Sequence, residues 1–292
     1  MLNYRIMANS VVSGQSIQSD DYKAFRKFLE EACGIVLGEN KQYLVANRLD
    51  NLLKELALDS IKNLIETLKN NPRSGLRERI IDAMTTNETS WFRDGYPFEI
   101  LKKVILPEVA QKKTREIRIW SAACSSGQEP YSISMIIQEF LRERPGGLTY
   151  SQIVSSEISA SMLQSAREGL YDKMSLSRGL SQERRERFFI ANDIRWQIKR
   201  EIRERVVFKE LNLMDSYMLL GRFDVVFCRN VLIYFSESVK ADILRRITRI
   251  LQPGGYLFLG ASESLTGCAD DYEILQLYDG IFYKLKNHSV KK

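Results

Sequence analysis

Ile117-Arg-Ile-Trp-Ser-Ala-Ala-Cys-Ser-Ser-Gly-Gln-Glu-Pro130 joins a short, partly β-branched run to a loop of small residues. The run predicts a strand over 117–121, and Pro130 suits the first turn of a helix expected over 129–140. Small residues allow a ligand to come close to the backbone. The stretch therefore predicts a strand, a ligand-binding loop and a helix in direct succession.

Strands and helices continue to alternate toward the C-terminus, which predicts an α/β fold with a doubly wound, mostly parallel sheet. Two last β-like runs, 272–277 and 280–284, predict an antiparallel hairpin at one edge of that sheet. The other expected elements are strands at 153–156, 224–228 and 256–260 and helices at 159–169 and 238–251.

The N-terminal third of the chain has a different character. We expect a disordered tail at 1–18 and an all-α domain at 19–90. The clearest element of this domain is a helix over 41–56, in which apolar residues recur at helical spacing. The α/β domain is expected to span 91–286, and a second tail to follow at 287–292.

A charged segment, 181–209, interrupts the alternation. It holds nine basic and five acidic residues, so it carries +4 of the net charge of +6. Residues 194–198 and 202–208 are expected to pair as antiparallel strands. We interpret the segment as a small β-subdomain inserted into the α/β domain.

Composition disfavours several classes of protein. No apolar run approaches the roughly 18 residues of a membrane helix, and the N-terminus lacks the apolar stretch of a signal peptide. We therefore expect a cytoplasmic location and no membrane insertion. The four cysteines form no CxxC pair and the only histidine is His288. This disfavours a disulfide framework, a metal site and histidine-based catalysis.

Polar side chains follow the expected strands, where ligands of open α/β sheets bind. Glu157 follows the second strand, where a carboxylate can accept hydrogen bonds from two ribose hydroxyls, and a polar-then-aromatic stretch, 228–235, follows the next. Singly, these features also fit a tight turn, a helix N-cap partner or core aromatics. Together they favour an adenosyl-ligand pocket. The absence of GxGxxG and of Gly-Lys-Ser/Thr argues against dinucleotide and P-loop sites.

Four motifs resemble those of one known family. They are Thr86-Asn-Glu-Thr-Ser-Trp-Phe-Arg93, Trp120-Ser-Ala-Ala-Cys-Ser-Ser-Gly-Gln-Glu-Pro-Tyr-Ser132, Phe227-Cys-Arg-Asn-Val-Leu-Ile-Tyr-Phe235 and Leu251-Gln-Pro-Gly-Gly-Tyr-Leu-Phe-Leu-Gly260. Over roughly residues 20–285 the chain resembles the CheR family of chemotaxis receptor methyltransferases. The resemblance implies an S-adenosylmethionine-dependent methyltransferase fold. It also implies methyl transfer to glutamate side chains of bacterial chemotaxis receptors, with S-adenosylhomocysteine as the second product.

The same resemblance implies roles for individual residues. Arg93 and Tyr234 are placed nearest to the transferred methyl group and are the catalytic candidates. Glu157 is implied to take the ribose, although the family usually has aspartate there. The implied cofactor-binding residues are Asn87, Thr89, Arg93, Glu129, Glu157, Asn212, Leu213, Arg229 and Asn230.

The implied partner is the cytoplasmic helical region of membrane chemoreceptors. In the family the N-terminal domain meets the methylated helices, and Lys41 and Arg48, seven residues apart on one expected helix face, are candidate contacts. A solvated helix face is the plainer interpretation of both. Members that hold a C-terminal receptor peptide carry a glycine-containing loop in the β-subdomain. Residues 190–193 and 199–201 contain no glycine, so we expect recognition without tail tethering.

The chemistry agrees with the residues. A glutamate carboxylate is ionised near neutral pH, so its in-line attack on a methyl sulfonium requires neither a general base nor a metal. Holding the reactants in line can supply about 7–11 kcal/mol. Two alternatives stay open: a nucleic-acid methyltransferase, which the net charge favours, and a non-catalytic scaffold that senses S-adenosylmethionine. Cys124 and Cys228 flank the expected pocket and are either redox-sensitive or small buried residues.

Arg93 provides a direct test. If its guanidinium orients a carboxylate of substrate or cofactor, Arg93→Ala should abolish most methyl transfer in a protein that still folds. Transfer would be measured with labelled cofactor, and folding by circular dichroism. Near wild-type transfer by a stably folded variant would leave Arg93 with a purely structural role.

Overall fold

The computed structural model describes residues 17–71 and 73–287, and the predicted tails and His288 lie almost wholly outside this part of the chain. The described residues divide into two compact units. The first reaches Met84 and leaves out Cys33–Ile35, and the second contains Cys33–Ile35 and everything from Thr85 onward.

Four helices form the first unit, as the prediction of an all-α domain required. The helix expected over 41–56 is α2, and it differs by one residue at each end. Helix α3 begins after Ser60, whose hydroxyl accepts the N–H of Asn63 and caps the helix. The four helices are α1 Ser19–Cys33, α2 Gln42–Glu55, α3 Ile61–Asn70 and α4 Leu76–Met84.

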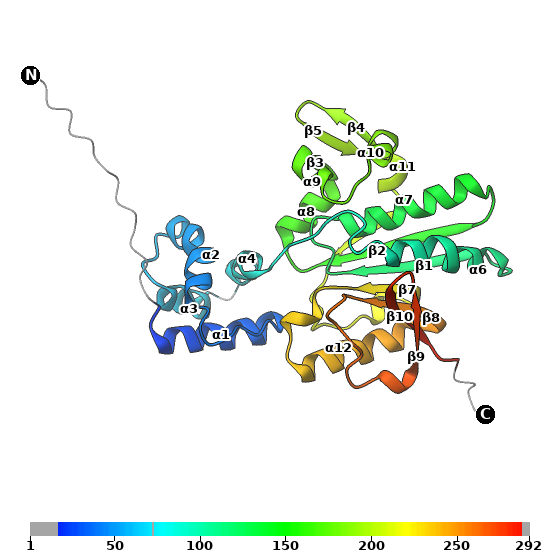
Figure 1. The fold of residues 1–292 in the computed structure, drawn as a ribbon. Coiled ribbons are helices and arrows are strands. Elements are labelled where there is room, and N and C mark those ends of the chain that lie inside the picture. Colours follow the sequence, from blue (N-terminus) through cyan, green and yellow to red (C-terminus); the bar gives the residue numbers. More distant parts are fainter. Residues whose placement is uncertain (1–16, 72, 288–292) are drawn as a thin grey trace, which may run out of the picture. The chain divides into compact units, whose positions relative to one another are not determined.

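A seven-stranded sheet organises the second unit, in the order β6-β2-β1-β7-β8-β10-β9 (Figure 1). Strands β6, β2, β1, β7 and β8 pair in parallel, and the hairpin β9–β10 adds antiparallel strands at one edge. The predicted sheet with its edge hairpin is confirmed. The strands are β1 Glu116–Ala122, β2 Tyr150–Glu157, β6 Val206–Glu210, β7 Phe223–Cys228, β8 Leu251–Leu259, β9 Tyr272–Leu277 and β10 Gly280–Leu285.

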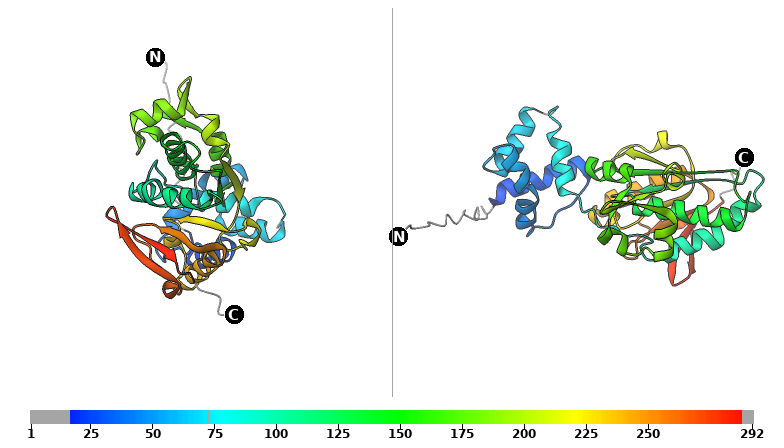
Figure 2. Two further views of the ribbon diagram at one scale, coloured as in Figure 1. Left: turned by 90° about the vertical axis from the view of Figure 1, so that its right-hand side faces the viewer. Right: turned by 90° about the horizontal axis from the view of Figure 1, so that it is seen from above.

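Side chains of β1 show why the strand is apolar on both faces. Ile117 and Ile119 pack into one core with the helices on one side of the sheet, while Trp120 and Ala122 pack into a second core with α12 on the other side. Successive side chains of a strand point to opposite faces. The sheet therefore lies between two helical layers, visible in Figures 1 and 2. Because both faces of its central strands are covered by apolar side chains, a polar ligand site is expected at the strand ends.

Helices cover both faces of this sheet. The bent helical segment α5–η1–α6 was not predicted from the sequence. Its middle turn, Leu101–Ile105, is a π-helix. Pro107, in the first turn of the following helix, has no N–H and cannot donate a regular helical hydrogen bond. The helices are α5 Tyr96–Ile100, η1 Leu101–Ile105, α6 Leu106–Gln111, α7 Gln128–Glu143, α8 Ala160–Glu168 and α12 Glu237–Ile250, with 3-10 turns η2 Met218–Leu220, η3 Leu232–Tyr234 and η4 Ala269–Asp271.

The β-subdomain differs from its prediction. Residues 202–208 do not pair with 194–198, because β6 joins the main sheet beside β2. A second, three-stranded sheet instead has the order β3-β5-β4 and begins earlier, at Leu170. Alternating apolar residues identify strands but not their partners. The subdomain, whose elements are labelled in Figure 1, comprises β3 Leu170–Asp172, α9 Lys173–Ser177, α10 Gln182–Phe188, β4 Phe189–Asn192, β5 Arg195–Ile198 and α11 Arg200–Arg203.

Two further predictions need adjustment. Strand β8 does not start after the Pro253–Gly255 turn; it runs through it as an irregularity in its pairing with β7. Residues 85–90, expected in the all-α domain, fall in the second unit, where Ser125 Oγ donates to the carbonyl of Asn87. No helix of the described residues is long and apolar enough to cross a membrane.

Candidate functional site

Three loops meet at the carboxyl end of β1 and β7. One follows β1 at 123–127, one follows β7 at 229–231, and one, residues 91–95, precedes α5. Ten described non-glycine residues have positive φ, and five of them lie in these loops: Phe92, Asp94, Ala123, Ser125 and Asn230. Such backbone persists only where the surroundings hold it, and it is typical of functional sites.

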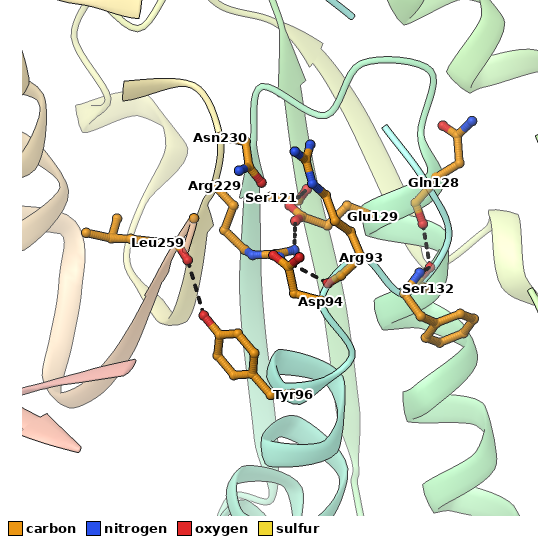
Figure 3. A network of polar contacts seen from close by, with 12 residues as sticks. Arg93, Asp94, Tyr96, Ser121, Gln128, Glu129, Ser132, Arg229, Asn230 and Leu259 are labelled. Atoms are coloured by element: carbon orange, nitrogen blue, oxygen red, sulfur yellow. Dashed lines mark hydrogen bonds and ion pairs between the residues drawn. The ribbon is translucent and has the colours of Figure 1, made fainter. Parts of the chain in front are cut away.

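Arg229 links the loops at 91–95 and 229–231 to the first turn of α7, which follows the loop at 123–127. Its side chain is only 1% exposed, and its Nη1 donates to Glu129 Oε2 at 3.0 Å. Its Nη2 donates both to the carbonyl of Arg93, at 3.0 Å, and to the carboxylate of Asp94 (Figure 3). Glu129 in turn accepts a bond from Ser121 Oγ at 2.8 Å. A buried cation is thus shared between two carboxylates and one carbonyl, as burial of charge requires.

Glu157 has a structural role in addition to the one predicted. Its carboxylate accepts the N–H groups of Ser125, Ile158 and Ser159 at 2.8–3.0 Å, and the residue is 5% exposed. It therefore holds the loop after β1 and the start of α8 together. Its contact with ribose stays a prediction.

Glu263 is a comparable carboxylate that the sequence analysis missed. It accepts the N–H groups of Asn230 and Gly260, both at 2.7 Å, and that of Ile233 at 3.3 Å. The N–H groups of Asn230 and Gly260 share Glu263 Oε2, and a Cβ on Gly260 would lie 2.7 Å from that oxygen. The close contact between residue 260 and the carboxylate therefore requires glycine. Glu263 lies just beyond the carboxyl end of β8, and the rule that identified Glu157 could have found it.

Asn230 presents an unsatisfied group. Its Oδ1 is buried and has no hydrogen-bond partner among the described residues. Such an atom is costly unless a ligand or water supplies a donor. Asn230 is therefore an indication that a ligand or a water molecule completes the site after β7.

The two catalytic candidates are both half-buried. Arg93 Nη1 donates to the carbonyl of Glu88 at 3.2 Å. Tyr234 ends the 3-10 turn η3 that follows β7. No hydrogen bond or cation–π contact joins their side chains in the described part of the chain, so their common role stays a prediction.

The remaining predicted cofactor residues lie on loops near the same strand ends. Asn87 and Thr89 are half-buried in the segment whose carbonyl, at Asn87, binds Ser125 Oγ at 2.8 Å. Asn212 and Leu213 follow β6; the Asn212 side chain accepts the N–H of Met214 at 3.0 Å, and Leu213 belongs to the core on the α12 side. The structure thus places these residues on loops at the same edge of the sheet.

Lys41 and Arg48 belong to the helical unit and differ from each other. Lys41 is exposed beside the ring of Tyr43. Arg48 is half-buried and donates to the carbonyl of Met84 at the end of α4. That bond satisfies a helix C-terminus, so Arg48 has a structural task that the sequence did not reveal.

Cys124 and Cys228, which the sequence analysis placed beside the expected pocket, are both buried. Burial raises the pKa of the Cys124 thiol, and the nearby Glu157 carboxylate adds to the effect. Burial likewise raises the pKa of Cys228. A thiol kept protonated is a weak nucleophile, which favours the packing interpretation. The described residues contain no group of three or more His, Cys, Asp or Glu arranged to hold a metal ion.

Comparisons with known proteins agree across both units. Residues 87–281 match the family model of the CheR methyltransferase SAM-binding domain, and residues 20–85 match that of the CheR methyltransferase all-alpha domain. Chemotaxis protein methyltransferase Cher2 of Pseudomonas putida is 55% identical over 91% of this chain and 98% of its own. Chemotaxis protein methyltransferase 1 of Pseudomonas aeruginosa is 54% identical over 93% of this chain and 100% of its own. Chemotaxis protein methyltransferase 1 of Vibrio cholerae is 52% identical over 93% of this chain and 98% of its own.

The arrangement predicts that Arg229 supports both stability and ligand binding. Arg229→Met leaves the carboxylates of Asp94 and Glu129 without a cation between them. The free energy of unfolding should fall by roughly 2–3 kcal/mol. This is less than for a fully buried ion pair, because the Asp94 side chain is one-third exposed. Chemical denaturation and calorimetric titration with S-adenosylhomocysteine measure the two effects. Arg222→Met is the control, because Arg222 is an exposed arginine immediately before β7, whereas Arg229 follows it immediately. If both variants behave alike, Arg229 does not organise the site.

Proposed function

The chain belongs to the CheR methyltransferase family, and from that membership we propose that it methylates glutamate side chains of bacterial chemotaxis receptors. It is an S-adenosylmethionine-dependent methyltransferase. The products are a glutamyl methyl ester and S-adenosylhomocysteine. A modification of this kind changes receptor charge and serves sensory adaptation.

The observation that carries this proposal is the extent of the match to chemotaxis protein methyltransferases. The relatives share more than half of the aligned residues, and the alignment spans nearly their whole length, both domains included. A nucleic-acid methyltransferase or a binding scaffold has no comparable support.

The crevice suits the cofactor. The buried Oδ1 of Asn230 is an acceptor that needs a donor, and an ammonium group or a ribose hydroxyl provides one. Glu129 and Glu157 place carboxylates at the ends of β1 and β2, as a positively charged ligand requires. We assign cofactor binding to Asn87, Thr89, Arg93, Glu129, Glu157, Asn212, Leu213, Arg229 and Asn230.

The residues of the chain contribute position and an environment with little water. When bound, S-adenosylmethionine supplies a methyl group on a positively charged sulfur, which a carboxylate oxygen can attack directly. We assign to Arg93 the orientation of a carboxylate, and to Tyr234 a hydroxyl group and an aromatic wall. Arg229 fixes the backbone of Arg93 from behind through the carbonyl bond at 3.0 Å. Such preorganisation lowers the barrier without a general base.

We further propose that recognition of the receptor is direct. Lys41 is exposed in the helical unit and remains a candidate contact, while Arg48 is partly engaged with Met84. The β4–β5 hairpin turns at Asp193 and Ile194 without glycine. This supports recognition of the methylated helices without capture of a C-terminal tail.

The reaction type is tested by incubating the protein with methyl-labelled S-adenosylmethionine and a cytoplasmic fragment of a chemoreceptor. Carboxyl methyl esters release methanol in alkali, whereas N-methyl groups do not. We expect alkali-labile label on the fragment. If several receptor fragments stay unlabelled although S-adenosylhomocysteine binds, the scaffold is favoured; label on RNA or DNA would favour the nucleic-acid alternative.

Tail independence is tested by pull-down with the same fragment, with and without its C-terminal tail. We expect equal retention of both forms, and equal rates of ester formation. Retention that depends strongly on the tail would contradict direct recognition, but it would leave the assigned reaction intact.

A further inference from the structure

The β-subdomain is in close contact with the segment that leads to Arg93. The N–H of Trp91 donates to the carbonyl of Arg178 at 3.0 Å. Gly179 packs so tightly there that an added Cβ would lie 2.1 Å from the Trp91 carbonyl oxygen. The Trp91 ring also meets Tyr171 and Phe189 edge-on, at 4.9 and 5.3 Å between ring centroids. The inserted subdomain therefore abuts the loop at 91–95.

Arg184 makes the most specific of these contacts. It lies on α10, and the centre of its guanidinium is 3.9 Å from the centroid of the Phe92 ring. The same guanidinium donates to both carboxylate oxygens of Glu139 on α7, at 2.8 and 3.1 Å. A planar cation held by a bidentate bond has one orientation. Its central carbon is thus held over the Phe92 ring.

Phe92 cannot shift without moving Arg93, which is the next residue. Phe92 has a φ of +48° and Asp94 a φ of +66°, both unusual for residues with a side chain. The N–H of Phe92 donates to Ser132 Oγ at 3.1 Å. Arg229 holds the other side of the loop, at Arg93 O and Asp94. A loop with strained backbone keeps its conformation only while the contacts that stabilise it, here those of Arg229 and Arg184, are present.

We propose that Arg184 of the β-subdomain is a positioning residue for methyl transfer: by stacking on Phe92 it fixes the loop that presents Arg93. This rests on the proposed function, because Arg93 is assigned to the reaction there. The β-subdomain is then part of the catalytic architecture and not an independent docking module. A receptor that binds this subdomain and shifts Arg184 would also change the position of Arg93.

Glu139 makes the inference testable without loss of the fold. Lys102 also binds Glu139, at 3.3 Å, so this buried carboxylate keeps a cation when Arg184 is removed. Burial opposes ionisation of Glu139, but hydrogen bonds from Arg184 and Lys102 outweigh it and hold the pKa below its usual value. Arg184→Met should therefore fold. Arg184→Lys, which keeps a charge beside Glu139 but loses the planar stack, is a second variant.

The control variant is Arg187→Met. Arg187 lies on the same helix and also places its guanidinium over a phenylalanine ring, at 5.0 Å from Phe188, but it does not touch Phe92. Two readouts are needed. One is hydrogen exchange of the amides at 91–95 in the protein with S-adenosylhomocysteine. The other is the rate of ester formation for Arg184→Met, Arg93→Ala and the double variant.

We expect faster exchange at 91–95 in Arg184→Met than in Arg187→Met, and a kcat lower by roughly ten- to a hundredfold, as misplacement of about 1 Å can produce. The double variant should be no slower than Arg93→Ala, because Arg184 acts through Arg93. Unchanged exchange, a normal kcat, or additive losses in the double variant would each overturn the proposal. If the wild type forms no ester, the proposed function fails, while the exchange readout still decides whether Arg184 fixes the loop.

Discussion

A single buried guanidinium joins the separate parts of the site. Arg229 is almost wholly shielded from water, so its charge must be met by acceptors, and these come from Glu129, Asp94 and the Arg93 backbone. Asp94 is 135 residues away along the chain. The loop that carries Arg93, the start of α7 and the end of β7 are therefore fixed as one piece. A shift in any of them would leave a buried charge without its partner.

Two buried or partly buried carboxylates stabilise the loops in a similar way, by accepting hydrogen bonds from their backbone N–H groups. Glu157 and Glu263 each accept three N–H groups from irregular segments at the strand ends. These bonds supply acceptors that regular secondary structure cannot provide there. They also explain how Ser125 and Asn230 remain at positive φ. The loops at the strand ends are thus held by the protein's own hydrogen bonds, which is the condition for catalysis by position.

The β-subdomain provides the second hold on the Arg93 loop. Arg229 acts from the sheet, and Arg184 and the carbonyl of Arg178 act from the subdomain. The proposed in-line methyl transfer depends on the placement of its substrate. Bracing of the loop from both sides is consistent with that demand, and it links the surface of the subdomain physically to the site.

The sequence alone determined the class of fold, the alternation of elements and the strand ends at which polar residues gather, because these follow from local periodicity and from the burial of strands on both faces. The strand-end rule indicated Glu157, and the resemblance to the CheR family implied Glu129, Arg229 and Asn230 as cofactor-binding residues. Only the tertiary structure decided partners. It assigned β6 to the main sheet, Arg48 to the end of α4, and Asp94 to Arg229. Each depends on segments distant in the chain coming together, and periodicity carries no information about which distant segments meet.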